Sequence, residues 1–188
     1  MVKKNACIFI SGEGSNFKNL LKRSRDYNFP ISIKLIISNN PNAKGINFAR
    51  RYSIPYLIVN TYLDNFETTI LNNLNKYKIN IICLAGYMKI ISKNFLRTFK
   101  KRVVNIHPSL LPKFKGLNTF KRILKEGETK TGCTVHFVDE TLDGGKIITQ
   151  KSFYIISGVN ELDLKKKTQK LEHVAYPEAI IKIFRFNY

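Results

Sequence analysis

Short apolar runs alternate with longer amphipathic stretches along the first half of the chain. The apolar runs are rich in β-branched residues and end at Gly, Asn, Pro or Ser, as buried strands do. They predict strands at Ala6–Ile10, Ile31–Ile37, Tyr56–Val59, Asn80–Leu84 and Val103–Ile106. Between them, apolar residues near helical spacing predict helices at Ser15–Arg25, Ala43–Tyr52, Asp64–Tyr77 and Ser92–Phe99. Asp64 and Ser92 stand where N-caps are expected.

The pattern changes after Pro112. A short helix is expected at Asn118–Glu126, followed by two extended segments, Gly132–Val138 and Lys146–Ile156. The turn Leu142–Gly145 joins these segments, so they suit a hairpin. The last element is a helix over Glu161–Phe184, which Pro177 is expected to bend or interrupt.

This order of elements predicts an α/β fold. Alternating strands and helices imply a Rossmann-like, mostly parallel twisted sheet with helices on both faces, and the hairpin adds a C-terminal antiparallel extension. No repeat, low-complexity tract or linker interrupts the 188 residues, so we expect a single domain over 1–188.

Composition favours a protein with an ordinary core in a reducing compartment. Hydrophobic residues make up 44% of the chain, yet no apolar stretch approaches the roughly 18 residues of a membrane span. The N-terminal apolar run ends at Ser11 after about six residues, which is shorter than a secretory signal needs. Cys7, Cys83 and Cys133 are widely separated in apolar sequence, so we expect buried free thiols and a cytoplasmic protein.

The formal net charge is +19, from 32 Lys and Arg against 13 Asp and Glu. Such a charge concentrates phosphorylated metabolites, and it would equally serve a nucleic-acid partner. The basic residues are spread along the chain, aromatics do not interleave with them, and Lys, Asn and Ile are abundant together. We therefore interpret the charge as a compositional bias and expect no nucleic-acid and no membrane partner.

A glycine-containing turn follows the first strand. Ser11–Asn16 reads SGEGSN and opens the first helix, where free backbone amides and the helix dipole favour a phosphate. Phe17 takes the place of the third glycine of a dinucleotide fingerprint, so a phosphate fits better than NAD. A plain strand-to-helix turn stays an open alternative, and Glu13 counts against a phosphate unless its side chain points to solvent.

An amide, an imidazole and a carboxylate occur at two chain reversals. Asn105 and His107 lie two residues apart at the end of the fifth strand, and Asp143 lies in the later turn. Acyl transfer needs an oxyanion donor, a proton carrier and an anion that orients the carrier, so the trio predicts an enzyme. Asp143 as a turn-capping residue and Asn105 as a strand-end residue stay open. His136 is equally compatible with lining a pocket and with a purely structural role. His173 lies on the last helix and is compatible with a position on the surface.

Four motifs together resemble the phosphoribosylglycinamide formyltransferase family, folate-dependent enzymes of purine biosynthesis. They are NIHPSLLP, LDGG, SGxGSN after the first strand and LAGYMKI after the fourth, and the resemblance continues to EHVAYP near the end. It implies formyl transfer from 10-formyltetrahydrofolate, a co-substrate, to the amine of phosphoribosylglycinamide in IMP biosynthesis. No metal is implied, and the protein is expected to be a monomer or homodimer.

The same resemblance implies roles for individual residues. Asn105 would bond the formyl oxygen, His107 would carry the proton, and Asp143 would orient His107 and favour its charged form. The substrate phosphate would be held by Gly14, Ser15 and Asn16. The rest of the substrate would contact Gln169, Lys170, Leu171 and Glu172. The folate would be bound by Asn105 and by two segments that line a pterin slot: Met88, Lys89, Ile90 and Ile91, and Leu142, Asp143 and Gly144.

The chain departs from the family at two places, and three rival functions remain. Asn60–Glu67 lacks the arginine that reaches the folate, and Glu13 brings a carboxylate into the phosphate loop.

Methionyl-tRNA formyltransferase shares the trio but usually has a further C-terminal domain. Formyltetrahydrofolate hydrolase uses water as the acceptor and normally has a further N-terminal domain. A basic RNA-binding module would make the trio a coincidence.

Overall fold

The computed structural model describes residues 2–186 and contains two compact units. The first extends to Val104 and the second begins at Asn105. Strand β5 (Arg102–His107) carries the chain from the first unit into the second. No helix in residues 2–186 is both long enough and apolar enough to cross a membrane.

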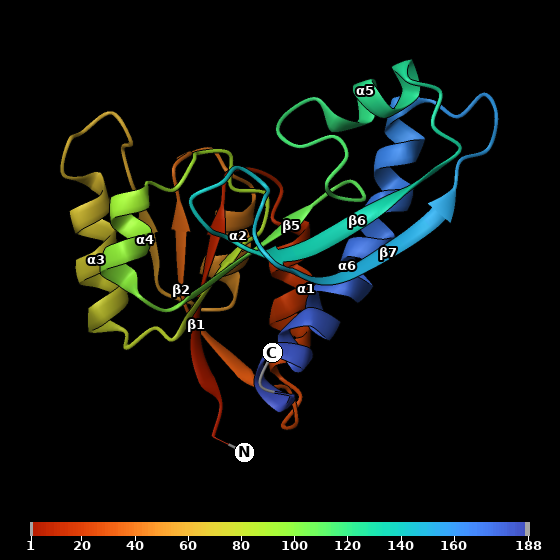
Figure 1. Cartoon of the computed structure of the whole chain (residues 1–188). Coiled ribbons are helices and arrows are strands. Elements are labelled where there is room, and N and C mark those ends of the chain that lie inside the picture. The colour runs from red at the N-terminus through yellow and green to blue at the C-terminus, as the bar shows by residue number, and fades with distance from the viewer. Residues whose placement is uncertain (1, 187–188) are drawn as a thin grey trace. The chain divides into compact units, whose positions relative to one another are not determined.

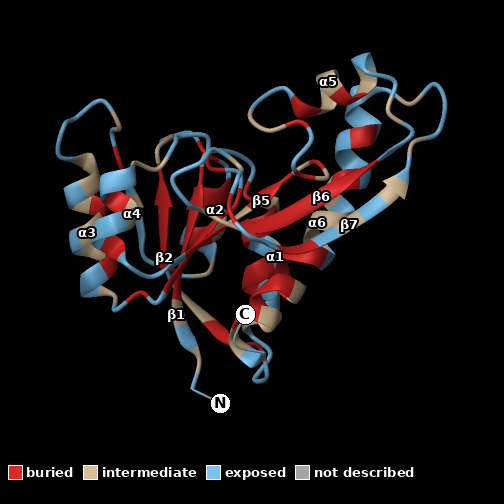
Figure 2. Ribbon diagram, viewed as in Figure 1, coloured by how far each residue is buried: buried red, intermediate tan, exposed pale blue. Residues whose placement is uncertain are grey.

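Four parallel strands form the centre of the first unit. They are β1 (Lys4–Ile10), β2 (Ile31–Ser38), β3 (Tyr56–Ile58) and β4 (Ile81–Leu84), in the order β3-β2-β1-β4. The pairing of β1 places Ile8 opposite Ile36 on β2 and Cys83 on β4. Ala6–Ile10 is fully buried, as Figure 2 shows in red, and β1 has a neighbouring strand on each side.

The helices of this unit pack in two pairs. Helix α1 (Ser15–Ser24) packs on α2 (Gly45–Arg51), and α3 (Phe66–Lys76) packs on α4 (Lys93–Phe99). Figure 1 shows α3 and α4 beside each other on one side of the strands. Ser92 caps α4 as predicted, since its side chain accepts a hydrogen bond from the Phe95 amide.

The prediction that Asp64 caps α3 is wrong. The N-cap is Asn65, and the chain reaches it through a turn in which the Phe66 amide donates to the Leu63 carbonyl. Backbone hydrogen bonds of this turn set the start of the helix, so a side-chain cap is not what defines it.

A hairpin and a long helix dominate the second unit. Strands β6 (Lys130–Phe137) and β7 (Ile147–Tyr154) are antiparallel, and α6 (Glu161–Arg185) packs on both. Helix α6 continues through the buried Pro177, so of the two predicted effects the interruption is wrong, and a bend stays a prediction. The short α5 (Thr119–Lys125) contributes Ile123 to a small core with Phe114 and Leu164. Parallel strands with flanking helices, followed by an antiparallel hairpin, confirm the predicted fold class.

Candidate functional site

The SGEGSN turn forms a tight backbone loop at the start of α1. Gly14 is the N-cap and has φ +72°, a backbone conformation that residues other than glycine rarely adopt. A methyl group on Gly14 would lie 2.7 Å from the Cα atom of Gly45, and the Gly45 amide donates to the Gly12 carbonyl at 3.0 Å. The loop is therefore held against the start of α2, and the N-terminal amides of α1 follow it directly.

The side chain of Glu13, which would oppose phosphate binding if it faced the loop, points to solvent. Its side chain is 69% exposed, and its carboxylate pairs with the Lys44 ammonium at 3.0 Å. The negative charge is directed to solvent and has a cationic partner. The carboxylate of Glu13 therefore does not prevent the loop from binding an anion.

The predicted pterin segment Met88–Ile91 is largely exposed in the first unit. Met88 is 63% exposed and Ile90 is 71% exposed. The backbone of this segment is held near both ends, because the Met88 amide donates to Ser11 and the Ser92 amide donates to Glu67. Glu67, in the first turn of α3, thus takes part in fixing the segment.

The structure brings the predicted trio together at the end of β5. The Nδ1 atom of His107 lies 3.3 Å from Oδ2 of Asp143, and these side chains are only 6% and 9% exposed. The Nε2 atom of His107 lies 2.8 Å from the Phe114 carbonyl oxygen. Since that carbonyl can only accept, Nε2 carries a hydrogen. Both ring nitrogens of His107 therefore lie beside oxygen atoms that can accept a hydrogen bond.

Asp143 is held by groups beyond its own turn. It has φ +47°, and its Oδ2 atom accepts a hydrogen bond from the Gly116 amide at 2.8 Å. Asp139 forms the local turn instead, since its carboxylate accepts from the Thr141 amide. The turn-capping role that was left open for Asp143 therefore belongs to Asp139.

His136 joins this cluster, and its two possible roles, lining a pocket or supporting the structure, both stay predictions. It is 2% exposed, with Nδ1 2.8 Å from the Phe137 carbonyl oxygen and Nε2 3.3 Å from Nδ2 of Asn105. Burial lowers the pKa of His136, although the Phe137 carbonyl and the Asp143 carboxylate act in the opposite direction. In the neutral form Nδ1 carries the hydrogen, so Nε2 accepts from the Asn105 amide. Alternation along β6 was the only sequence signal for this position.

The four predicted substrate residues on α6 occupy consecutive positions. Lys170 is exposed, while Gln169, Leu171 and Glu172 are half-buried. Burial, and after it the negative charge of Glu172, raises the pKa of the Cys133 thiol to about 12. His173, for which a surface position was left open, is half-buried, and burial lowers its pKa. The substrate roles of these α6 residues stay predictions.

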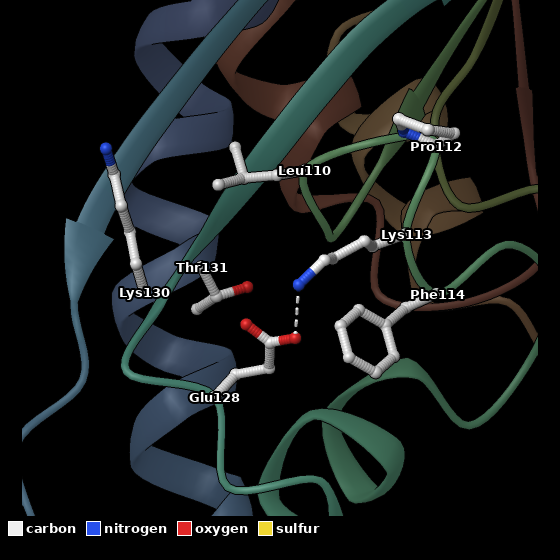
Figure 3. Close-up of a pocket in the computed structure, with 7 residues that line it drawn as sticks. All are labelled: Leu110, Pro112, Lys113, Phe114, Glu128, Lys130 and Thr131. Carbon is white, nitrogen blue, oxygen red and sulfur yellow. Dashed lines mark hydrogen bonds and ion pairs between the residues drawn. The ribbon is translucent and has the colours of Figure 1, made fainter.

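A cavity of about 350 Å³ lies beside the loop that follows His107 (Figure 3). The Lys113 ammonium and the Glu128 carboxylate pair across it at 2.7 Å. None of the trio lines it; the lining residues are Leu110, Pro112, Lys113, Phe114, Glu128, Lys130 and Thr131. The cavity is thus distinct from the cluster of titratable side chains around Asp143.

The thiols and the acidic side chains do not form a metal centre within residues 2–186. No group of three or more His, Cys, Asp or Glu in this range is placed to hold a metal ion. All three cysteines are free and buried, as predicted. The polar chemistry of the second unit therefore rests on the imidazole, carboxylate and amide groups described above.

Comparison with known proteins assigns the family. The formyl transferase family model matches residues 4–180. The phosphoribosylglycinamide formyltransferase of Bacillus subtilis is 35% identical over 98% of this chain and 96% of its own length. A crystal structure of the Brucella melitensis phosphoribosylglycinamide formyltransferase superimposes with a TM-score of 0.91 at 36% identity, covering 97% of this chain and 96% of that one.

Longer relatives contain a region of the same kind. The trifunctional purine biosynthetic protein adenosine-3 of Drosophila melanogaster is 39% identical over 184 residues, which are 95% of this chain. The chain matches only 14% of the length of that relative and 18% of the human protein of the same name. The agreement of family model, sequence and fold across both units means that this chain belongs to the formyl transferase family of enzymes.

Proposed function

We propose that this enzyme transfers a formyl group from 10-formyltetrahydrofolate to the amine of phosphoribosylglycinamide, a step of purine biosynthesis. The observation that carries the proposal is the pair of buried side chains His107 and Asp143, with Asn105 joined to the same cluster through His136, on a formyl transferase fold. The name shared by relatives of nearly equal length supports the choice of acceptor.

The reaction is a direct transfer between two nitrogens. The neutral amine of the acceptor attacks the formyl carbon, and the carbonyl oxygen gains negative charge. The bond between the formyl carbon and N10 of the folate then breaks, N10 takes up a proton, and the amine nitrogen loses one. The products are the formylated amide and tetrahydrofolate, so atoms and charge balance without an oxidant or a metal.

Asn105 is suited to stabilise the developing oxyanion. One hydrogen of its amide nitrogen points to Nε2 of His136, which lies 3.3 Å away. The amide nitrogen has a second hydrogen, and that one is available to an oxyanion. Because neutral His136 fixes the orientation of the amide, the donor is positioned before the substrate arrives. A positioned donor of this kind is typically worth about 3 kcal/mol in the transition state.

His107 is suited to carry the proton, but its Nε2 atom is engaged by the Phe114 carbonyl. Proton exchange with a substrate requires Nε2 to leave that partner, while Nδ1 keeps Asp143. The proposal therefore includes a movement of the loop Phe114–Asn118, in which Phe114 and Asn118 both have positive φ values. Faster amide hydrogen exchange in this loop after both substrates bind is the expected result, and equal exchange contradicts the movement.

The first unit is suited to hold the anionic parts of the substrates. The amides at the start of α1 favour the acceptor phosphate, and Glu13 is neutralised by Lys44. In the folate segment Lys89 is an exposed cation. It supplies a positive charge for an anionic ligand such as a folate carboxylate, whereas Asn60–Glu67 contains no basic residue.

The test is a comparison of acceptors with one formyl donor. Purified protein receives 10-formyltetrahydrofolate together with phosphoribosylglycinamide, methionyl-tRNA or water alone, and formylated product and tetrahydrofolate are both measured. We expect transfer to phosphoribosylglycinamide only. Transfer to tRNA, or release of formate without an acceptor, would replace the proposal with one of the two rival formyl-folate activities.

A further inference from the structure

Ser11 lies at a junction of three chain segments in the first unit. It follows β1 directly and precedes the glycines of the phosphate loop. Its backbone amide donates to the Gly86 carbonyl at 3.1 Å, beyond the end of β4. Its carbonyl accepts from the Asn40 side-chain amide at 2.9 Å, beyond the end of β2. The backbone of Ser11 is therefore fixed to the carboxyl ends of both neighbouring strands.

The hydroxyl of Ser11 makes two further hydrogen bonds, to the same two segments that follow β2 and β4. It donates to Oδ1 of Asn39 at 2.6 Å and accepts from the Met88 amide at 2.8 Å. A hydroxyl group can donate and accept at once, whereas alanine can do neither. One side chain thus connects the entry of the phosphate loop with the first residue of the predicted folate segment.

The far end of the folate segment has its own anchor. The carboxylate of Glu67 accepts from the Ser92 amide at 3.1 Å and from the Ser92 hydroxyl at 2.5 Å. The Ser92 oxygen in turn caps α4. Because this end is fixed to two helices, a shift of the segment on binding a ligand acts on the Met88 end, where Ser11 is the partner.

We propose that Ser11 is a positioning residue that couples the binding of the two substrates, so that folate on the Met88 segment tightens the loop that holds the acceptor phosphate. This inference rests on the proposed function. Coupling between two sites is reciprocal and typically changes affinity about fivefold or more. Without the hydroxyl, each ligand binds independently of the other.

The test measures the affinity for phosphoribosylglycinamide by calorimetry, with and without saturating folic acid, which carries no formyl group to transfer. We expect folic acid to tighten binding about fivefold or more in the parent protein and in Ser11→Thr. In Ser11→Ala the ratio is expected to stay within about twofold of unity. Ser24→Ala is the matched control, because that hydroxyl donates to the Leu21 carbonyl of its own helix.

The outcomes separate the two proposals. An unchanged ratio in Ser11→Ala, or a ratio of one in the parent, overturns the coupling while both ligands still bind. Failure of the parent to bind either ligand overturns the proposed function as well. If thermal melting shows that Ser11→Ala does not fold, Asn39→Ala removes the acceptor of the same hydroxyl, and the loss or persistence of coupling in that variant decides.

Discussion

The two units of this enzyme carry very different charge. Residues 1–104 contain 18 basic and 4 acidic residues, whereas residues 105–188 contain 14 basic and 9 acidic residues. Basic residues are about equally dense in both, so the bias toward lysine acts on the whole chain. The units differ in their carboxylates, which are scarce in the first. The net charge is +14 in the first unit and +5 in the second.

The polar groups of the candidate sites differ in the same sense. In the first unit, the loops around Ser11 are joined by neutral groups of Ser11, Asn39, Asn40 and the backbone, which do not titrate near pH 7. In the second, two imidazoles, those of His107 and His136, each lie within 3.6 Å of the Asp143 carboxylate. The first unit is thus suited to hold anions and the second to handle protons. Four predictions test this division.

The largest effect is expected at the proton carrier. His107→Ala removes the imidazole, and we expect kcat for formyl transfer to fall by about 10² to 10⁴, with the KM values for both substrates nearly unchanged. Single-turnover kinetics with saturating substrates measures the step. His173→Ala, a histidine outside the trio, is the control and should keep kcat within about twofold. A similar loss in both variants would show that folding, and not proton transfer, is affected.

Next in size is the hairpin that carries Asp143. A methyl group on Gly145 would lie 2.0 Å from the Phe137 carbonyl oxygen, so Gly145→Ala forces β6 and β7 apart. We expect a loss of roughly 1–3 kcal/mol in the free energy of unfolding. Denaturant titration measures this quantity. Gly12→Ala, where the added methyl meets no atom within 4 Å, should leave stability unchanged. Equal losses would mean that crowding at Gly145 is relieved elsewhere.

A smaller effect is expected from salt. If the charge of the first unit attracts anionic substrates, raising the ionic strength from low to high should raise KM for phosphoribosylglycinamide by up to roughly tenfold. The value of kcat should change little, because His107 and Asp143 are buried. Initial rates over a salt series provide the measurement. A salt effect confined to kcat would place the electrostatic contribution in the second unit.

The smallest effect is the pH dependence of stability from His136. Because its pKa is lowered in the folded protein, the unfolded chain binds a proton more readily as the pH falls below 6.5. Stability should therefore decrease from pH 7 toward the lowered pKa, with a slope of at most about 1.4 kcal/mol per pH unit. Urea titrations of His136→Gln should show a shallower slope than the parent.

His173 provides the comparison for that measurement, since burial lowers its pKa as well. His173→Gln should also flatten the slope, but only His136→Gln should reduce kcat, because His136 contacts Asn105. Reduced kcat in both variants would argue against a specific role for His136 in orienting that amide.

Much of this architecture was predictable because local sequence determines it. Buried strands such as Ala6–Ile10 are continuous apolar runs, and Ser92 is an N-cap that needs only its own helix. The meeting of His107 and Asp143 was predictable because this fold brings strand ends and turns to one edge, while the roles of these residues stay predictions. The single-domain organisation and the cytoplasmic location stay predictions.

Other features depend on partners distant in sequence, which a linear pattern does not reveal. The exposure of Glu13 depends on Lys44, and the role of His136 depends on Asn105 from another strand. The sequence predicts Ser11 only as the first residue of the SGEGSN turn. Its hydrogen bonds to Asn39 and Met88 depend on the arrangement of three strands, β1, β2 and β4.

The close approach of Gly14 and Gly45 affects how the enzyme tolerates mutation. A methyl on Gly45 would lie 2.5 Å from the end of the buried Ile10 side chain and 3.2 Å from the Cα atom of Gly14, so a side chain at Gly45 is crowded, although less severely than one at Gly14. A saturation library selected for growth should therefore lose the bulky substitutions at Gly45. Gly45 would then appear essential although it lies outside the predicted ligand-binding residues, and a screen that equates intolerance with ligand contact would misassign it.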